Sequence, residues 1–376
     1  MTVANEVEKR SPAKKPAAEA GANGSGASGS GAAERQRLRT MMLIRRFEER
    51  TYQEYTRAPE PDAYGNKIQK IGGFCHLYSG QEAIAVGIAS LFQKDKDYLV
   101  TGYRCHGHSL ALGMDPRAGF AELFGKATGC SKGKGGSMHF FDAEAGNMGG
   151  HGIVGGHIPL GLGLAFTQGY KKTGGVTFCL FGDGAINQGT HNESLNMASL
   201  LKAPIVWIVE NNGVAMGTQV ERSSAEPDLA ERGSGYRMPN WNIDGNDIDV
   251  VMQEIGKAAD RARRGEGPGY IVANTFRFRG HSMSDPMKYR TKEEIERAKT
   301  RDPITMYEVR LREKGLITDQ QIEQIEEEVA QVITDAVKLA DEDPHPPLED
   351  RFNDVLAERY PYEPGAKDCG PEQRCT

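Results

Sequence analysis

The chain has 376 residues, with 46 Lys and Arg against 52 Asp and Glu, which gives a formal net charge of −6. This balance argues against a nucleic-acid-binding face, and we expect no nucleic-acid partner. No apolar run approaches the ~18 residues of a transmembrane helix, so we expect no membrane partner either. The length suffices for one large domain or two modest ones. The six cysteines form no CxxC pair, which predicts free thiols in a reducing compartment.

Composition changes at both ends of the chain. Residues 1–33 are rich in Ala, Gly, Ser, Lys and Pro, and we predict a disordered tail there. That tail lacks the apolar core of a signal peptide, and its Glu residues count against a transit peptide. We therefore expect one domain over residues 34–362 with a helical C-terminal part, and a loose tail over 363–376. The expected location is the bacterial cytoplasm, with the mitochondrial matrix as the alternative.

Helical patterns open the predicted domain. Residues 34–57 place apolar side chains on one face of a helix, and Pro59 follows its end. A second helix is predicted from the HLYSGQEA segment (76–83) to about Phe92, with Ser79 as N-cap and Glu82 completing a capping box.

A strand over residues 98–101 leads into the GYRCHGH segment (102–108). An arginine just past a strand end, here Arg104, can clamp diphosphate oxygens bidentately. The alternative is a surface arginine beside two solvated histidines.

Three glycine-rich segments follow. The segment GKATGCSKGKGGS (125–137) does not fit a Walker A loop, and we predict a mobile, cationic cavity wall. The pattern GxGxxG starts at Gly24 and again at Gly150; neither copy follows a strand signal, so we interpret both as accidents of composition. Gly161, Gly163 and Ala165 would form a small-residue face on a helix, for contact between subunits or for packing within the chain.

The stretch 176–212 carries the chemistry. A buried strand (176–181) ends in Gly182-Asp183-Gly184, a helix follows at about 192–201, and a second strand (205–209) ends in Asn211-Asn212. Strand, helix and strand in this order are typical of a parallel sheet, so both polar clusters lie at carboxyl ends of neighbouring strands. Asp183 and an Asn could supply oxygens for Mg²⁺, which also takes phosphate oxygens. Gly184 and Ala185 leave room for phosphate near a helix start.

The remaining elements complete an α/β pattern. A strand over 270–275 precedes a loop of small polar residues around His281, which is either solvated or placed to donate a hydrogen bond or move a proton beside a diphosphate. Helix starts are predicted at Thr291 with Glu294, at Asp302-Pro303 with Gly315 as the stop, and at Thr318 with Gln321.

Together these motifs resemble a known family. GDG with NN, GYRCHGH, HLYSGQEA, GGHGIVGGH and RGHSMSDP are similar to the α subunits of heterotetrameric, thiamine-diphosphate-dependent 2-oxo acid dehydrogenases, over roughly residues 37–362. The resemblance implies a doubly wound α/β fold, with a mostly parallel sheet and helices on both faces. It also implies thiamine diphosphate and Mg²⁺ as cofactors.

The resemblance assigns roles residue by residue. It implies that Asp183, Asn212 and the carbonyl of Val214 ligate Mg²⁺, although the family often has Tyr at the last position. The residues implied along the diphosphate are Tyr103, Arg104, Gly184, Ala185 and His281, and the backbones of Gly152 and Val154 are implied at the aminopyrimidine. Gly182, Asp183 and Asn212 are also expected to bind the cofactor. His281 and His76 are our candidates for proton transfer, or for orienting the substrate and lipoyl group.

The resemblance also implies a reaction and partners. The HSMSDP loop and His76 are similar to those of pyruvate enzymes, with acetoin or branched-chain 2-oxo acid dehydrogenases as alternatives and an inert scaffold subunit as the non-enzyme alternative. The implied reaction is oxidative decarboxylation of pyruvate with reductive acetylation of a lipoyl domain on a dihydrolipoyl acyltransferase core. In this family the activating Glu belongs to a β subunit, so we expect an α2β2 heterotetramer and half an active site in this chain.

Overall fold

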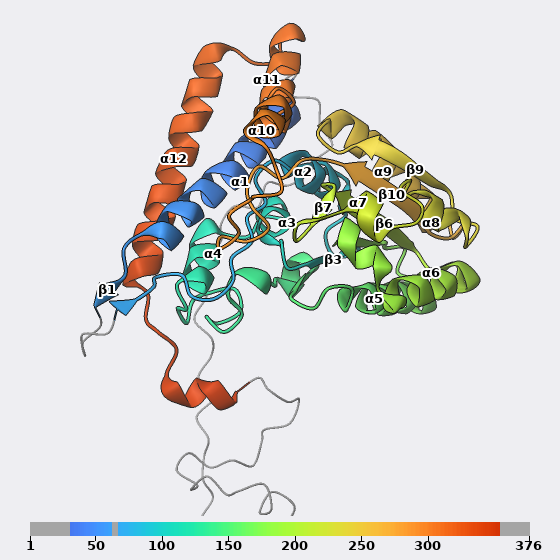
Figure 1. The fold of residues 1–376 in the computed structure, drawn as a ribbon, viewed down its shortest axis with the longest axis horizontal. Helices are drawn as coiled ribbons and strands as arrows, with labels where there is room; N and C mark the ends of the chain where they lie inside the picture. The colour runs from blue at the N-terminus through green and yellow to red at the C-terminus, as the bar shows by residue number, and fades with distance from the viewer. Residues whose placement is uncertain (1–30, 62–66, 354–376) are drawn as a thin grey trace, which may run out of the picture. The chain divides into compact units, whose positions relative to one another are not determined.

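The structure, a computed structural model, describes residues 31–61 and 67–353 (Figure 1). The predicted tails therefore lie outside the described residues, apart from positions 31–33. A six-stranded sheet runs through the described domain in the order β4-β3-β5-β6-β10-β9, and every neighbouring pair is parallel. Its strands are β3 (Tyr98–Gly102), β4 (Asn147–His151), β5 (Thr177–Gly182), β6 (Ile205–Asn211), β9 (Asn240–Asp244) and β10 (Gly269–Asn274).

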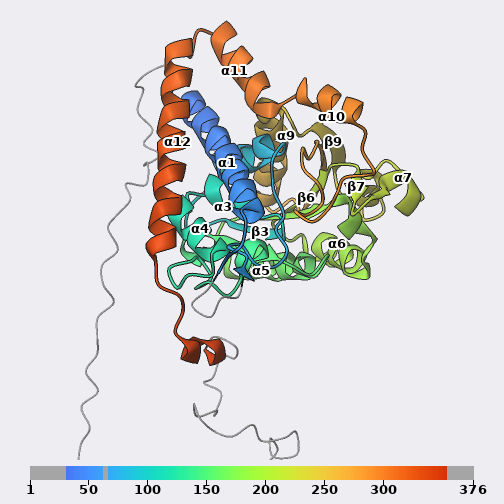
Figure 2. The ribbon, with the colours of Figure 1, turned by 60° about the vertical axis from the view of Figure 1, so that its left-hand side comes forward.

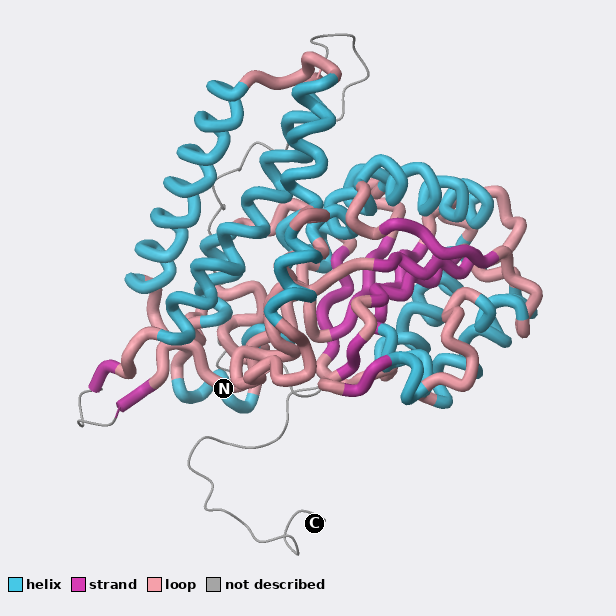
Figure 3. The backbone as a smooth tube through the Cα atoms, turned by 45° about the horizontal axis from the view of Figure 1, so that its top comes forward, coloured by secondary structure: helices cyan, strands magenta, loops and turns pink. Residues whose placement is uncertain are grey.

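Helices cover both faces of the sheet (Figure 3). Helices α5 (His157–Lys171) and α6 (Gly189–Leu201) pack on one face, and α2 (Glu82–Leu91) and α9 (Ile248–Arg263) pack on the other. In β5, Cys179 and Phe181 contribute to the first core, whereas Phe178 and Leu180 contribute to the second. Because both faces are buried, the strands read as continuous apolar runs rather than alternating ones. The predicted doubly wound α/β fold is confirmed.

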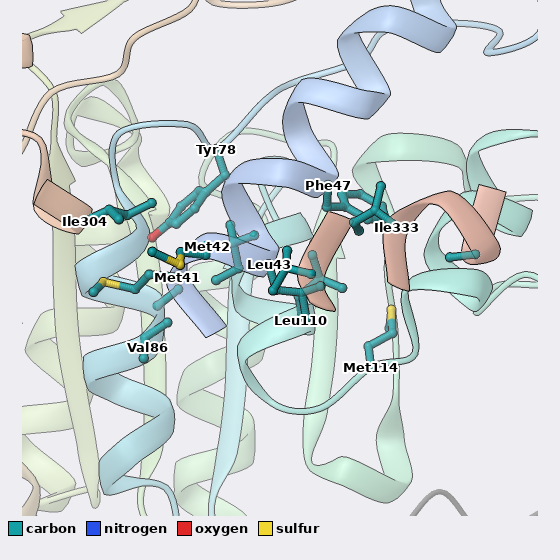
Figure 4. Packing of buried hydrophobic residues seen from close by; sticks show 14 of the residues in the cluster. Met41, Met42, Leu43, Phe47, Tyr78, Val86, Leu110, Met114, Ile304 and Ile333 are labelled. Atoms are coloured by element: carbon teal, nitrogen blue, oxygen red, sulfur yellow. The ribbon is translucent and has the colours of Figure 1, made fainter. Parts of the chain in front are cut away.

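A layer of helices stands beside the sheet and has its own apolar core. It contains α1 (Ala32–Thr56), α3 (His106–Ala111), α4 (Pro116–Leu123), α11 (Pro303–Glu313) and α12 (Asp319–Glu342). Helix α1 packs along α12, as Figures 1 and 2 both show. Met41, Phe47, Leu110 and Ile333 meet in this core (Figure 4). The C-terminal helices thus close over the N-terminal one.

Shorter elements connect these layers. They are the ribbons β1 (Glu60–Pro61) with β2 (Lys67–Ile68) and β7 (Val214–Ala215) with β8 (Thr218–Gln219), the helices α7 (Val220–Ser223), α8 (Glu231–Ser234) and α10 (Lys292–Lys299), and the 3-10 turns η1 (Gly136–Met138), η2 (Ala143–Ala145), η3 (Asp183–Asn187) and η4 (Leu348–Phe352). No helix in the described ranges is both long enough and apolar enough to span a membrane.

The predicted helix starts in the C-terminal part are confirmed. Thr291 and Thr318 each form a complete capping box at the start of α10 and α12. The Asp302 side chain caps α11 with Pro303 at its first position, and Gly315 follows the end of that helix with φ +64°. A left-handed glycine there satisfies the last carbonyls without steric cost.

One prediction of local structure was wrong, and two strands were not predicted. Helix α2 begins at Glu82 rather than near Ser79, and Ser79 does not cap it. The Glu82 carboxylate is instead bound by Arg45 of α1, with Nε and Nη2 at 2.6 and 3.0 Å from its two oxygens. Strands β4 and β9 were not predicted, because one is rich in Gly and the other in Asn, which are residues of low strand propensity.

Candidate active site

A cavity of about 440 Å³ opens at the carboxyl ends of β3, β4, β5, β6 and β10. Strand β3 lies between β4 and β5: the chain goes from β3 to β4 on one side and then crosses back past β3 to β5 on the other. Such a reversal of strand order creates a crevice between strand ends. All residues predicted for the site line this one cavity: His76, Tyr103, Arg104, Gly152, Val154, Gly182, Asp183, Gly184, Ala185, Asn212, Val214 and His281. Residues as distant in the chain as His76 and His281 thus line the same cavity. The roles assigned to these residues stay predictions.

Asp183 is the first residue of the turn η3, directly after β5, and is only 5% exposed. Burial raises the pKa of its carboxyl group, although Arg277 and Arg290 nearby act in the opposite direction. A buried carboxylate at a strand end is a strong ligand for a hard cation once the cation offsets its desolvation. The adjoining Gly184 is required, since a Cβ there would lie 2.6 Å from the Ala215 Cβ.

Asn212 is held by three neighbours. Its side-chain amide donates to Gln81 Oε1 at 3.2 Å, its Oδ1 accepts from Arg277 Nη1 at 3.4 Å, and its carbonyl accepts from Arg290 Nη2 at 2.9 Å. The described residues contain no group of three or more His, Cys, Asp or Glu that could hold a metal. The predicted magnesium set fits this finding, because it has a single carboxylate and needs phosphate oxygens to complete its coordination.

Two buried cations, Arg104 and Arg277, line the cavity predicted to hold the diphosphate. Arg104 donates to the carbonyls of Leu77 at 2.6 Å and His281 at 2.8 Å, which leaves further guanidinium donors for a ligand. Burial and the charge of Arg277 lower the pKa of Arg104 to about 10, and the same two causes lower that of Arg290 to about 10. Lowered arginine pKa values indicate that too few negative groups lie nearby to balance the positive charge. A bound polyanion would supply that negative charge.

Arg277 is a cavity residue that sequence reasoning missed. It lies in the loop after β10, is 1% exposed, and lines the cavity. Its guanidinium donates to the Arg279 carbonyl at 3.0 Å and to the Tyr289 hydroxyl at 3.0 Å. Its position in the sequence gave no sign of burial, because arginines in polar loops are usually exposed.

Three aromatic rings form one side of the cavity. The His76 ring centroid lies 4.5 Å from that of Tyr103 and 5.3 Å from that of His281. Burial and the charge of Arg104 lower the pKa of His76 to about 2 and that of His281 to about 4. Both rings are therefore neutral at pH 7 in this structure, and each can accept or donate a proton as a neutral imidazole does.

A second missed group lies at the end of β6. Glu210 lines the cavity, and its Oε1 accepts from the Tyr78 hydroxyl at 2.5 Å and lies 3.1 Å from His108 Nε2. Burial, followed by the charge of Glu210, raises the pKa of Tyr78. The sequence does offer a signal for Glu210, because this glutamate ends an apolar run directly before Asn211-Asn212. The two histidines expected around Arg104 in the solvated alternative are buried instead.

The GxGxxG copy from Gly150 lies at the cavity, and its interpretation as an accident of composition stays a prediction. It starts in β4, runs through the cavity residues Gly152 and Val154, and ends at Gly155 just before α5. Gly155 has φ +79°, a conformation that favours glycine. The copy at Gly24 lies outside the described residues.

The segment 125–137 does not line the cavity, contrary to the expected cavity wall. Its backbone wraps the carboxylate of Glu122 in α4. Oε2 accepts from the amides of Ser131 and Gly133 at 2.7 and 2.9 Å, and Oε1 accepts from those of Gly135 and Gly136 at 2.7 and 2.9 Å. The glycines thus form an anion nest for an internal carboxylate.

The small-residue face of α5 is used within the chain. A Cβ at Gly161 would lie 2.8 Å from the Cys179 Sγ, and Ala165 is buried in the same core, so both pack on the sheet. Gly163 has no neighbour within 4 Å of a Cβ and faces away. Of the two interpretations, packing within the chain therefore holds for Gly161 and Ala165.

Comparison with known proteins gives the class of this site. A family model described as the dehydrogenase E1 component matches residues 39–349, and the chain belongs to that family. Among its relatives is the pyruvate dehydrogenase E1 component subunit alpha of Rhizobium meliloti, 45% identical over 351 residues, which are 93% of this chain and 97% of that protein. The subunit of the same name from Zymomonas mobilis is 43% identical, covering 86% and 88%. The mitochondrial subunit of that name from Dictyostelium discoideum is 45% identical, covering 78% of each chain. The resemblance drawn from the motifs is confirmed.

Proposed function

We propose that this chain is the α subunit of a thiamine-diphosphate-dependent pyruvate dehydrogenase and binds the diphosphate end of the cofactor through Mg²⁺. The proposal rests on one observation: the buried residues Asp183, Arg104, Arg277 and His281 line the same cavity at the strand ends. The relatives that bear the pyruvate dehydrogenase name support pyruvate as the substrate. A bacterial cytoplasm or a mitochondrial matrix accords with the sources of these relatives.

The residues of this chain have separate tasks in the proposal. Asp183, Asn212 and the Val214 carbonyl hold Mg²⁺, while Arg104 and Arg277 offset the diphosphate charge. When bound, thiamine diphosphate supplies the nucleophilic carbon and the electron sink for decarboxylation of a 2-oxo acid. His281 donates a hydrogen bond from its ring to a phosphate oxygen, and His76 holds or moves a proton at the substrate through a ring nitrogen. Burial of the cavity floor excludes water from these contacts.

A β subunit completes the site in this proposal. Helices α5 and α6 begin near the cavity and run toward the opposite edge of the sheet. They expose these large apolar side chains along their length: Leu160, Phe166, Tyr170, Met197, Leu200 and Leu201. Tyr170 and Leu200 are 80% and 79% exposed, and Ile153 and Val154 at the cavity are also exposed. Apolar patches of this kind mark protein interfaces. We place the β subunit, with its activating carboxylate, over this surface in an α2β2 particle that acetylates a lipoyl domain of the acyltransferase core.

The test is activity of the co-expressed α and β chains. Release of CO₂ is measured with pyruvate, 2-oxobutyrate and branched-chain 2-oxo acids, with the α chain alone as the control. We expect turnover of pyruvate above the others, only when both chains are present and with Mg²⁺ and thiamine diphosphate added. Preference for a branched acid, or no turnover of any acid by the assembled pair, contradicts the proposal. Light scattering on the same sample gives the assembly mass, and Leu200→Glu should separate the chains.

A further inference from the structure

A buried chain of hydrogen bonds leads from α1 to the backbone of His76. His106 Nδ1 lies 3.1 and 3.0 Å from the two carboxylate oxygens of Glu48, and His106 Nε2 lies 2.9 Å from Ser137 Oγ. The main-chain N–H of His76 donates to that same Oγ at 3.2 Å. Because a carboxylate only accepts, the proton on Nδ1 is fixed and so is the orientation of the imidazole.

These residue types are those of a hydrolase triad, but the surroundings exclude that chemistry. Glu48 and His106 have no exposed surface and Ser137 is 3% exposed, so no substrate reaches the hydroxyl. The His106 ring packs edge-on against Phe47 and at a tilt against Phe140, with ring centroids at 5.7 and 4.7 Å. The Ser137 Oγ is occupied by a backbone amide rather than presented to a cavity. Glu48, His106 and Ser137 therefore have a structural role, and that role depends on the backbone group that they hold.

The segment 76–78 is held from two sides. The Glu48 carboxylate that orients His106 also accepts from the main-chain N–H of Tyr78 at 2.9 Å, so alternate amides of the segment are held by one network. The intervening Leu77 carbonyl accepts from Arg104 at 2.6 Å. Each of these three consecutive residues thus has one backbone polar group, the N–H or the carbonyl, bound by a buried side chain.

His76 depends on this backbone support. The Nδ1 atom of its buried ring has no hydrogen-bond partner within the described part of the chain. The ring contacts it makes are with Tyr103 and His281, themselves residues of the cavity. A side chain without a side-chain hydrogen bond takes its position from the backbone that carries it, and displacements of about 1 Å in an active site cost up to roughly 100-fold in rate.

We propose that Glu48, His106 and Ser137 are positioning residues that hold the His76 ring at the candidate active site. The inference deepens and rests on the proposed function, in which His76 acts at the substrate. It also gives the glycine-rich segment a purpose. The nest around Glu122 fixes the path of residues 131–136 and delivers Ser137, the next residue, to the His76 amide. The helical layer is thereby connected to the cavity through Glu122, Ser137 and His76.

Kinetics of the assembled α and β chains test the inference through a double-mutant cycle. Ser137→Ala should lower kcat for acetylation of a lipoyl domain by roughly tenfold, with a smaller change in KM for pyruvate. In a His76→Ala background the same substitution should change kcat less than about twofold, because the residue it positions is gone. Equal losses in both backgrounds would overturn the inference. Ser224→Ala is the matched control, since it removes a buried hydroxyl that has no partner among the described residues.

Hydrogen exchange gives a readout that does not depend on activity. Ser137→Ala and the more conservative Ser137→Cys should both raise amide exchange in a peptide covering residues 74–80, with Cys between wild type and Ala. Exchange in β5 should stay unchanged in a folded variant. Unchanged exchange in residues 74–80 for both variants contradicts the inference. If the wild-type pair fails to decarboxylate pyruvate, the proposed function is wrong, and the exchange data still decide whether Ser137 holds the His76 backbone.

Discussion

Arg104 donates a hydrogen bond to the main-chain carbonyl of His281 at 2.8 Å, which ties the loop after β10 to the loop after β3. The amide of the same His281 donates to Asp285 Oδ2 at 2.6 Å, and Tyr289 donates to that oxygen at 2.6 Å. The peptide groups of His281 are thus bound on both sides while its ring faces the cavity. Any polyanion that draws Arg104 or Arg277 toward itself acts on this loop.

We predict that thiamine diphosphate with Mg²⁺ protects residues 277–290 from hydrogen exchange and proteolysis. The arginines and the His281 imidazole gain charged partners only when the diphosphate is present. His281→Ala should weaken the protection and lower acetylation of the lipoyl domain. Exchange mass spectrometry of both proteins, with and without cofactor, makes the measurement. The same exchange in all four samples would remove the assigned role of His281.

Asp183→Ala should abolish Mg²⁺-dependent binding of thiamine diphosphate. The substitution removes the one anionic ligand of the predicted metal set and leaves the buried arginines without it. Calorimetric titration of the cofactor in the presence of Mg²⁺ measures the loss, which we expect to exceed tenfold in Kd. Asp260→Ala, on the exposed side of α9, is the control and should bind normally. Wild-type affinity in Asp183→Ala would refute the metal assignment.

Cofactor binding should draw protons onto the histidines of the cavity. The pKa of His281 is about 4 and that of His76 about 2 in the absence of ligand, and a nearby polyanion raises both values. A group whose pKa rises on binding takes up protons, so the uptake should grow as pH falls from 7 toward 6. Calorimetry in two buffers of different ionisation enthalpy gives the proton count. His281→Gln should take up fewer protons than wild type; identical counts would show that its ring does not meet the diphosphate.

The fold should lose stability as pH falls below the ordinary histidine pKa. Burial lowers the pKa of His157 to about 4 and that of His191 to about 4, so below pH 6.5 the unfolded chain binds protons that the folded chain does not. Each such histidine adds a slope of up to about 1.4 kcal/mol per pH unit between pH 6.5 and 4. Urea unfolding across that window measures the slope. His191→Gln should flatten it, whereas His345→Gln, at an exposed site, should leave it unchanged.

Glu122→Gln should destabilise the helical layer by about 2 kcal/mol. The substituted amide NH₂ group would face backbone N–H donors that now meet a carboxylate oxygen, so donors would oppose donors. Chemical denaturation of the two proteins gives the difference. Glu144→Gln serves as the exposed control. Surface substitutions usually change the free energy of unfolding by about 0.5 kcal/mol or less. A variant within about 0.5 kcal/mol of wild type would show that the nest contributes little to stability.

The parts of the fold that the sequence predicts are those set by local pattern. The apolar runs of β5 and β6 and the caps at Thr291, Asp302 and Thr318 depend on neighbours within a few residues, and the structure has them as expected. The GDG and NN clusters could be paired because parallel strands end at one edge of a sheet.

What escaped prediction depends on distant contacts. The burial of Arg277 is set by the Tyr289 hydroxyl and Asn212, and nothing in its own loop indicates it. Glu122 anchors amides nine to fourteen residues further along, beyond the reach of any helical or turn pattern. Glu82, expected to complete a capping box with Ser79, is instead bound by Arg45 of another helix, and α2 begins at Glu82 itself. Tertiary partners override local signals at all three places.

The packing of α1 against α12 also has a consequence for how the chain is made. Helix α1 leaves the ribosome early, whereas the helix that covers its apolar side ends at Glu342. Contacts between such distant segments form slowly, because the long loop between them must close first. Phe47, which lies beside Ile333 of α12 (Figure 4), therefore remains uncovered by that helix through most of translation. We expect a nascent chain of this protein to bind chaperones until its last helices emerge, and a truncation before residue 319 should aggregate rather than fold.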